Sequence, residues 1–274
     1  MAAPQDQALT SGATPADLAR QVTVLISAIV GTLVAFVGSG AVVGTPVNEV
    51  ADGSLATDAT LVAPAGPAFA IWSVIYTGLL WLAVLQLLPG RRTDPRQRRT
   101  GWWIAASALI NAAWVLVVQA EWLWASVAVI VALLAVLVVV LVRLNERQPT
   151  STAEKIAVDG TMGLYLGWVC IATVANTAAA LVFSGWAATE STATTWAVVV
   201  LGVAAGVGLL LAVGLRGRIA PALALAWGLS WVAVARTDEP ENTAAAVMAV
   251  VAAIITLGSA LLVRSRTGGP FSHS

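Results

Sequence analysis

The sequence has very few of the residues that most soluble enzymes use for chemistry. Among its 274 residues there is one cysteine, Cys170, and one histidine, His273, which lies next to the C-terminal end. A single cysteine excludes an intrachain disulfide and a zinc site built from cysteines. A histidine in that terminal position excludes histidine ligation of haem iron within the apolar part of the chain. We interpret Cys170 as a small buried hydrophobic residue.

Charged residues are also scarce. They make up 10% of the chain, against about 25% in an ordinary soluble domain. The 14 basic and 14 acidic residues cancel, so there is no basic surplus of the kind that binds nucleic acid. Apolar residues reach 59% and the mean hydropathy is +0.87. This composition excludes a disordered chain and predicts a polytopic membrane protein.

Long apolar runs predict an all-α integral membrane protein with about eight transmembrane helices. About 20 apolar residues cross a bilayer as a helix, and helices satisfy every backbone amide where lipid offers no partner. The runs are continuous, whereas strands of a membrane barrel alternate. We expect the first run to be a retained helix, with a cleaved signal peptide as the alternative. The predicted spans are residues 21–44, 69–89, 102–119, 122–144, 160–184, 196–215, 219–235 and 242–264.

The basic residues predict how these helices are oriented. Short cytoplasmic loops are enriched in Lys and Arg, and an eight-helix arrangement with both termini in the cytoplasm places every base there except Arg236. The arginine-rich loop at residues 90–99 is interpreted as a topology anchor, with an anionic-lipid site as the alternative. The first external loop, roughly residues 45–68, has three acids and no base. It is either a lid or a passive connector.

Polar side chains in the middle of the predicted spans are few, and no carboxylate or base lies there, which disfavours a proton-coupled pump. Asn111 and Asn176 are the main exceptions, and a buried amide needs partners, so both should face other helices. They either join helices or anchor a ligand in an indole-lined cavity, which would suit a planar hydrophobic molecule. Helical spacing places each amide on one face with large rings. The candidate ligand-binding residues are Trp72, Tyr76, Asn111, Trp114, Tyr165, Trp168, Ala172 and Asn176.

Three motifs carry a family resemblance. Residues 67–76 resemble the Pro/Phe-containing W-x-x-[IL]-Y stretch of the tryptophan-rich sensory protein family, also called the translocator or peripheral benzodiazepine receptor family. Residues 111–114 are similar to its N-x-x-W motif, and residues 165–176 to its Y-x-x-W-x-x-x-A-x-x-x-N motif. The motifs occur in the family's order on predicted helices two, three and five.

The resemblance covers residues 21–184 and implies a five-helix bundle with an internal pocket. Family members bind porphyrins, sterol-like molecules and synthetic aromatic ligands, and the first loop would close over the pocket. Three features depart from the family pattern. Leu164 stands where a proline usually precedes the tyrosine, and the Phe-to-Trp spacing around Phe69 is shorter than in the common pattern. Residues 196–264 also add three helices that five-helix members lack. The chain resembles a longer bacterial branch.

These observations together predict a polar cytoplasmic tail (residues 1–20), a five-helix ligand-binding bundle (21–184), three additional transmembrane helices (185–264) and a second cytoplasmic tail (265–274). The predicted function is a receptor or sensor in the bacterial cytoplasmic membrane for a planar hydrophobic ligand, with a tetrapyrrole preferred. The alternatives are a transporter for a small hydrophobic solute, a light-dependent porphyrin-degrading protein and a structural membrane component. No acid–base or nucleophile constellation favours an enzyme, and neither a metal nor a cofactor other than a porphyrin ligand is predicted. Small residues in the C-terminal region leave a homodimer open.

Overall fold

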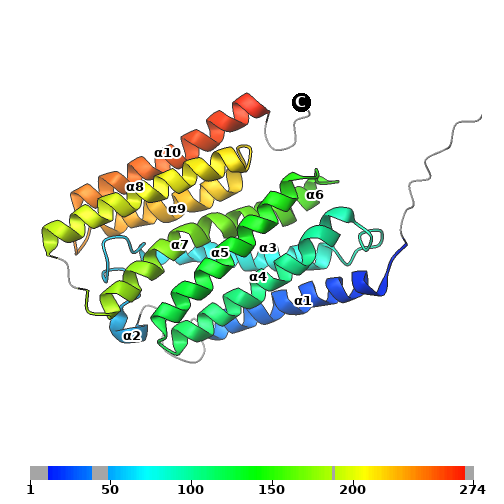
Figure 1. The fold of residues 1–274 in the computed structure, drawn as a ribbon, viewed down its shortest axis with the longest axis horizontal. Helices are drawn as coiled ribbons and strands as arrows, with labels where there is room; N and C mark the ends of the chain where they lie inside the picture. Colours follow the sequence, from blue (N-terminus) through cyan, green and yellow to red (C-terminus); the bar gives the residue numbers. More distant parts are fainter. Residues whose placement is uncertain (1–11, 39–48, 187–188, 269–274) are drawn as a thin grey trace, which may run out of the picture.

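The protein is built from helices, as seen in a computed structural model that describes residues 12–38, 49–186 and 189–268 (Figure 1). Within these ranges the chain forms no strand. The elements are α1 (Pro15–Phe36), α2 (Val50–Gly53), the 3-10 helix η2 (Gly66–Ala70), α3 (Ile71–Leu85), α4 (Pro95–Gln119), α5 (Leu123–Asn145), α6 (Thr152–Glu154), the π-helix η3 (Lys155–Gly160), α7 (Thr161–Phe183), α8 (Glu190–Gly214), α9 (Ile219–Ala235) and α10 (Thr243–Thr267).

The apolar lengths of these helices confirm the predicted fold class. In the described part of the chain, seven helical segments are long and apolar enough to cross a membrane, and α9 is a shorter apolar helix. The protein is therefore an all-α, multi-pass membrane protein of about eight helices, and its environment is the lipid bilayer.

Helix boundaries differ from the prediction where polar caps extend an apolar run. The first helix begins at Pro15 and not at residue 21, because the side chain of Thr14 accepts from the Asp17 backbone and Asp17 accepts from the Thr14 backbone. This reciprocal pair satisfies amides at the helix start. Part of the predicted tail at residues 1–20 is therefore helical, while the predicted end of this span at residue 44 lies outside the described residues. The fifth span also begins earlier, since α6 and η3 lead directly into α7.

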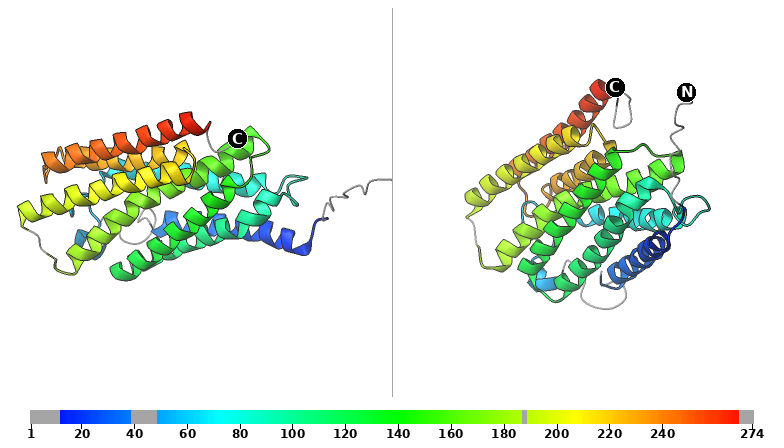
Figure 2. Two further views of the ribbon diagram at one scale, coloured as in Figure 1. Left: turned by 45° about the horizontal axis from the view of Figure 1, so that its top comes forward. Right: turned by 45° about the vertical axis from the view of Figure 1, so that its right-hand side comes forward.

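The long helices form two groups that meet at α7. In one group α1 packs on α4, α4 on α5 and α5 on α7, with α3 against α1 and α7. In the other, α8, α9 and α10 pack on one another, and α9 packs on α7. Figures 1 and 2 show α8, α9 and α10 gathered on one side of α7, with the other helices on its opposite side.

Small residues allow α9 to lie close to α7. A Cβ atom added to Gly167 would overlap the backbone carbonyl oxygen of Pro221, and one added to Gly163 would lie 2.7 Å from the Ala220 Cβ atom. Glycine at these positions lets two helix backbones approach, which is the usual way that helices associate in lipid. The C-terminal helices are thus packed on the five-helix group through a close backbone contact.

A buried ion network joins the two groups at the end of the molecule that carries the arginine-rich loop. Arg96, at the start of α4, contacts Glu154 at 2.9 Å and also pairs with Asp159 in η3. Arg218, which immediately precedes α9, pairs with the same Asp159 oxygen at 2.6 Å. Burial lowers the pKa of Arg218, and the neighbouring Asp159 carboxylate opposes this effect. One carboxylate therefore links α4, η3 and the beginning of α9.

Candidate functional site

Five aromatic side chains from η2, α3 and α7 form a contiguous group, which we call the aromatic cluster: Phe69, Trp72, Tyr76, Tyr165 and Trp168. Trp72 stacks on Tyr76 with ring centroids 5.1 Å apart, as expected for residues one helical turn apart. Trp72 also makes edge-to-face contacts with Tyr165 at 5.7 Å and with Trp168 at 6.2 Å. Phe69 contacts Trp168 at 5.5 Å. All four separations lie within the range in which aromatic rings attract one another.

The cluster is buried at α7 and open at η2. The side chain of Tyr165 is fully buried and Trp168 is 1% exposed, whereas Trp72 and Tyr76 are half-buried and Phe69 is 41% exposed. The Tyr165 hydroxyl donates to the Ser107 carbonyl at 3.2 Å. The Trp168 indole N–H, by contrast, is buried without a hydrogen-bond partner among the described residues. A buried donor without an acceptor is destabilising and is therefore rare in folded proteins.

Both predicted amides face neighbouring helices, as the helical spacing led us to expect, and each is 2% exposed. The Asn111 amide donates to the Tyr76 hydroxyl at 2.9 Å, which connects α4 to α3. The Trp114 indole donates to the Asn176 side-chain oxygen at 2.9 Å, and the Asn176 amide donates to the Ser126 hydroxyl at the same distance. Each amide therefore bridges helices, in agreement with the structural interpretation of these residues.

The structure thus gathers the predicted site residues along the facing sides of α3, α4 and α7. Direct contacts join these residues in two separate groups. Trp72, Tyr76, Asn111, Tyr165 and Trp168 form one group. Trp114 and Asn176 form the other, and the half-buried Ala172 lies on α7 between Trp168 and Asn176. The rings and amides occupy the space between these helices themselves. A flat ligand in this place would have to displace ring contacts that the protein now makes internally.

Three contributions to this region were not predicted. Ser126 of α5 accepts a hydrogen bond from the Asn176 amide and so completes this bridge. The sequence could have indicated this role, because Ser126 is the only residue with a hydroxyl group between Leu123 and Leu144. Phe69 extends the cluster beyond the predicted set. Trp227, which was not among the predicted site residues, donates its indole N–H to the Ala68 carbonyl at 2.9 Å and so ties α9 to η2.

Most other tryptophans lie on the surface, as expected for residues at membrane interfaces. Trp102, Trp122, Trp124, Trp186 and Trp196 are exposed. The Arg143 guanidinium lies 5.0 Å from the ring centre of the half-buried Trp103. Cys170 is buried, in agreement with its interpretation as a small apolar residue.

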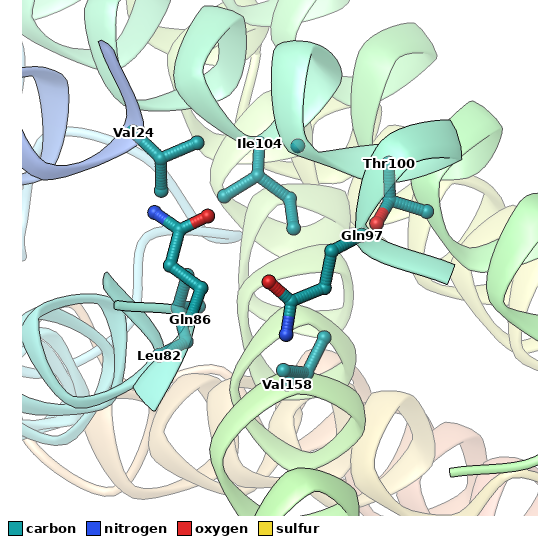
Figure 3. Close-up of a pocket in the computed structure, with 8 residues that line it drawn as sticks. Val24, Leu82, Gln86, Gln97, Thr100, Ile104 and Val158 are labelled. Atoms are coloured by element: carbon teal, nitrogen blue, oxygen red, sulfur yellow. The ribbon is translucent and has the colours of Figure 1, made fainter. Parts of the chain in front are cut away.

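Two cavities lie away from the aromatic cluster. The smaller one has about 10 Å³, room for roughly one water molecule, and Figure 3 shows the Gln86 and Gln97 side chains extending into the space between α3 and α4 beside it. The larger, which we call the α7–α8 groove, has about 770 Å³. It is bounded by residues 58–62 of the first loop, by α7 and α8, and by Pro240. None of the eight predicted site residues lines either cavity.

The fold and the site together define a polytopic helical membrane protein whose interior is filled by aromatic rings and bridging amides. A family model described as TSPO-like protein matches residues 22–262, which is nearly the whole chain. The chain therefore belongs to the TSPO-like family, and the match covers α8, α9 and most of α10. Comparisons with curated proteins and with solved structures gave no match.

Proposed function

We propose that this protein is a membrane receptor that binds a planar hydrophobic ligand, in the first place a tetrapyrrole, at the aromatic cluster. The observation that carries the proposal is the Trp168 indole N–H, which is buried without an acceptor in the middle of the cluster. A ligand with a hydrogen-bond acceptor in the plane of a flat ring system would satisfy this donor. The surrounding rings would supply stacking surface.

The exposure of the cluster indicates how a ligand would reach it. Phe69 is its one exposed member and Trp72 is half-buried, and both touch Trp168. If these two rings swing aside, a flat ligand gains the Trp168 face and its free N–H. Asn111 and Asn176 then hold α3, α4, α5 and α7 in place around the ligand through their bridges, so their role is to position the helices.

The residues of the cluster fit a metal-free porphyrin better than a ligated haem. The Tyr76 hydroxyl accepts from Asn111, and the Tyr165 hydroxyl donates to the Ser107 carbonyl. Cys170 lies two residues from Trp168, which turns it about 200° around α7, away from the cluster. Among the described residues no group of three or more His, Cys, Asp or Glu side chains could hold a metal ion. The proposed contacts are therefore ring stacking and a hydrogen bond from Trp168.

Titration of the purified protein with protoporphyrin tests this function. In mild detergent, porphyrin should quench the tryptophan fluorescence of the wild type saturably, and the Trp72→Phe/Trp168→Phe variant should bind at least about tenfold more weakly, since stacking contributes about 1–3 kcal/mol per ring. Trp81→Phe is the matched control, because Trp81 is an exposed residue of α3 outside the cluster. Equal affinity of the cluster variant and this control would refute the proposed site.

We also propose that both termini face the cytoplasm of a bacterial cell. The arginines at residues 91, 96 and 218 meet in one buried network, as expected if they share a side of the membrane. A Cys170→Ala background with Gly90→Cys or Asp238→Cys tests the orientation. An impermeant maleimide applied to intact cells should label residue 238 and leave residue 90 unlabelled. The reverse pattern would overturn the assignment.

A further inference from the structure

The α7–α8 groove is a second concave site, separate from the aromatic cluster. Its volume of about 770 Å³ falls in the range of about 300–1,000 Å³ that is typical of small-molecule sites. Val174 and Ala178 on α7 give it an apolar wall, and Trp186 and Trp196 add two indoles in edge-to-face contact at 6.1 Å. A groove of this kind can hold an apolar body of drug-like size.

The C-terminal helices hold the first loop in place beside this groove. Arg236, at the end of α9, is 1% exposed and donates to the Thr57 carbonyl at 2.7 Å. The Ala65 amide donates to the Trp231 carbonyl of α9 at 3.1 Å. These two bonds fasten the loop on either side of residues 58–62, which form part of the groove. Arg236, the one base that departs from the cytoplasmic pattern, thus has a structural role on the opposite side.

The polar atoms of the groove are mainly hydrogen-bond acceptors. The Thr173 hydroxyl donates to the Val169 carbonyl at 2.7 Å, and the Thr177 hydroxyl donates to the Thr173 carbonyl at 2.8 Å. Their protons are therefore engaged, and only lone pairs remain. Asp58 adds an exposed carboxylate whose negative charge also acts on the buried Arg236 guanidinium. The buried Thr60 hydroxyl has no hydrogen-bond partner among the described residues. The Thr60 hydroxyl can accept as well as donate, so a ligand donor complements every polar group of the groove, and a cationic donor also matches the charge of Asp58.

We propose that the α7–α8 groove binds a hydrophobic amine, with its ammonium group at Asp58 and Thr60 and its apolar body against Val174, Ala178 and Trp196. A primary ammonium has three donors and no acceptor, which complements the acceptors of the groove. The indole faces also attract cations. None of the five residues of the aromatic cluster lines the groove, so this site is separate from the tetrapyrrole site proposed above, and the Asp58 carboxylate disfavours the propionate groups of a porphyrin.

Three pyrene probes that differ only in their polar group test the proposal: aminomethylpyrene, hydroxymethylpyrene and pyrenecarboxylate. Binding is followed as saturable energy transfer from tryptophan to pyrene in a neutral detergent. The amine should bind the wild type about tenfold more tightly than the carboxylate. Asp58→Asn should weaken amine binding about fivefold and leave hydroxymethylpyrene within about twofold, because an exposed ion pair contributes modestly. Glu121→Gln, in the turn between α4 and α5, is the isosteric control and should change nothing.

A second variant tests the location without relying on charge. Ala193→Trp places a large ring on α8 in the groove and should weaken both the amine and the alcohol at least about tenfold, while protoporphyrin binding stays unchanged. Equal affinities of the three probes, or an Asp58→Asn variant that binds the amine normally, would overturn the proposal. Native mass spectrometry tests whether a lipid fills the groove. If phosphatidylethanolamine stays bound to the wild type and is lost from Ala193→Trp, the groove is a site for a bilayer lipid and the proposal is overturned. Amine binding without any porphyrin binding would refute the tetrapyrrole proposal alone.

Discussion

The indole N–H of Trp114 donates a hydrogen bond of 2.9 Å to the side-chain oxygen of Asn176 and thereby joins α4 to α7. The same amide donates to Ser126 of α5, so one side chain connects three helices. Lipid offers no competing hydrogen bonds, so the Trp114 N–H would lose its acceptor without Asn176. The Ser126 hydroxyl would keep only its bond to the Leu123 carbonyl. Asn176 is therefore a structural junction on the same helix as Tyr165 and Trp168 of the aromatic cluster.

Replacing Asn176 with leucine, which has a similar size and no polar atom, should destabilise the protein. The Trp114 N–H and the Ser126 hydroxyl would lose a partner, at a cost of about 1–3 kcal/mol, and average bonds in bilayers contribute about 0.6 kcal/mol each. Thermal unfolding in detergent should show a lower Tm. Thr177→Val is the control, because the Thr177 hydroxyl bonds only to its own helix. If Trp114→Phe and Asn176→Leu lower the stability additively in a double-mutant cycle, the two side chains are not coupled.

Local sequence patterns predicted the helices and the inward faces of Asn111 and Asn176, because a 3.6-residue repeat and the cost of exposing an amide to lipid are properties of single helices. The start of α1 was missed because hydropathy ignores the Thr14–Asp17 capping pair. Local patterns could not predict contacts between segments that are distant in the sequence. The Trp227–Ala68 bond spans 159 positions, and the α7–α8 groove needs a loop, two helices and Pro240 to come together. These depend on how the helices pack, which no periodicity specifies.

Gly167 provides a test of the close packing between α7 and α9. Gly167→Ala places a Cβ atom against the Pro221 carbonyl, and the backbone of α9 can retreat only by losing neighbouring contacts. We expect a loss of about 1–3 kcal/mol, the usual cost of overpacking. The control is Gly206→Ala in α8, where an added Cβ atom would meet nothing within 4 Å. The Tm of both variants is measured in the same detergent, and Gly167→Ala should have the lower value. An equal Tm would show that this contact does not hold α9 against α7.

Asp159 provides a test of the buried ion network. Asp159→Asn removes the negative charge that Arg96 and Arg218 share, and breaking one partner of a buried pair costs about 3–5 kcal/mol. The matched control is Glu146→Gln, which breaks the exposed pair with Arg99 and should cost at most about 1 kcal/mol. Unfolding by denaturant in detergent measures both. If Asp159→Asn lowers the free energy of unfolding by no more than the control does, the buried network stabilises the protein no more than an exposed ion pair.

Trp227 tests whether the C-terminal helices position the entrance of the aromatic cluster. Its indole bond to the Ala68 carbonyl holds η2, and η2 carries Phe69 against Trp168. Trp227→Phe removes this bond and keeps a ring, so the amide of Ala68, which donates to the Ala65 carbonyl at 2.9 Å, should exchange its hydrogen about tenfold faster. Trp231→Phe is the matched control, because Trp231 holds the loop through its backbone carbonyl, which the substitution retains. Hydrogen exchange read by mass spectrometry over residues 65–70 separates the two variants. Identical exchange would mean that α9 does not restrain η2, and the three C-terminal helices would then have no demonstrated influence on the cluster.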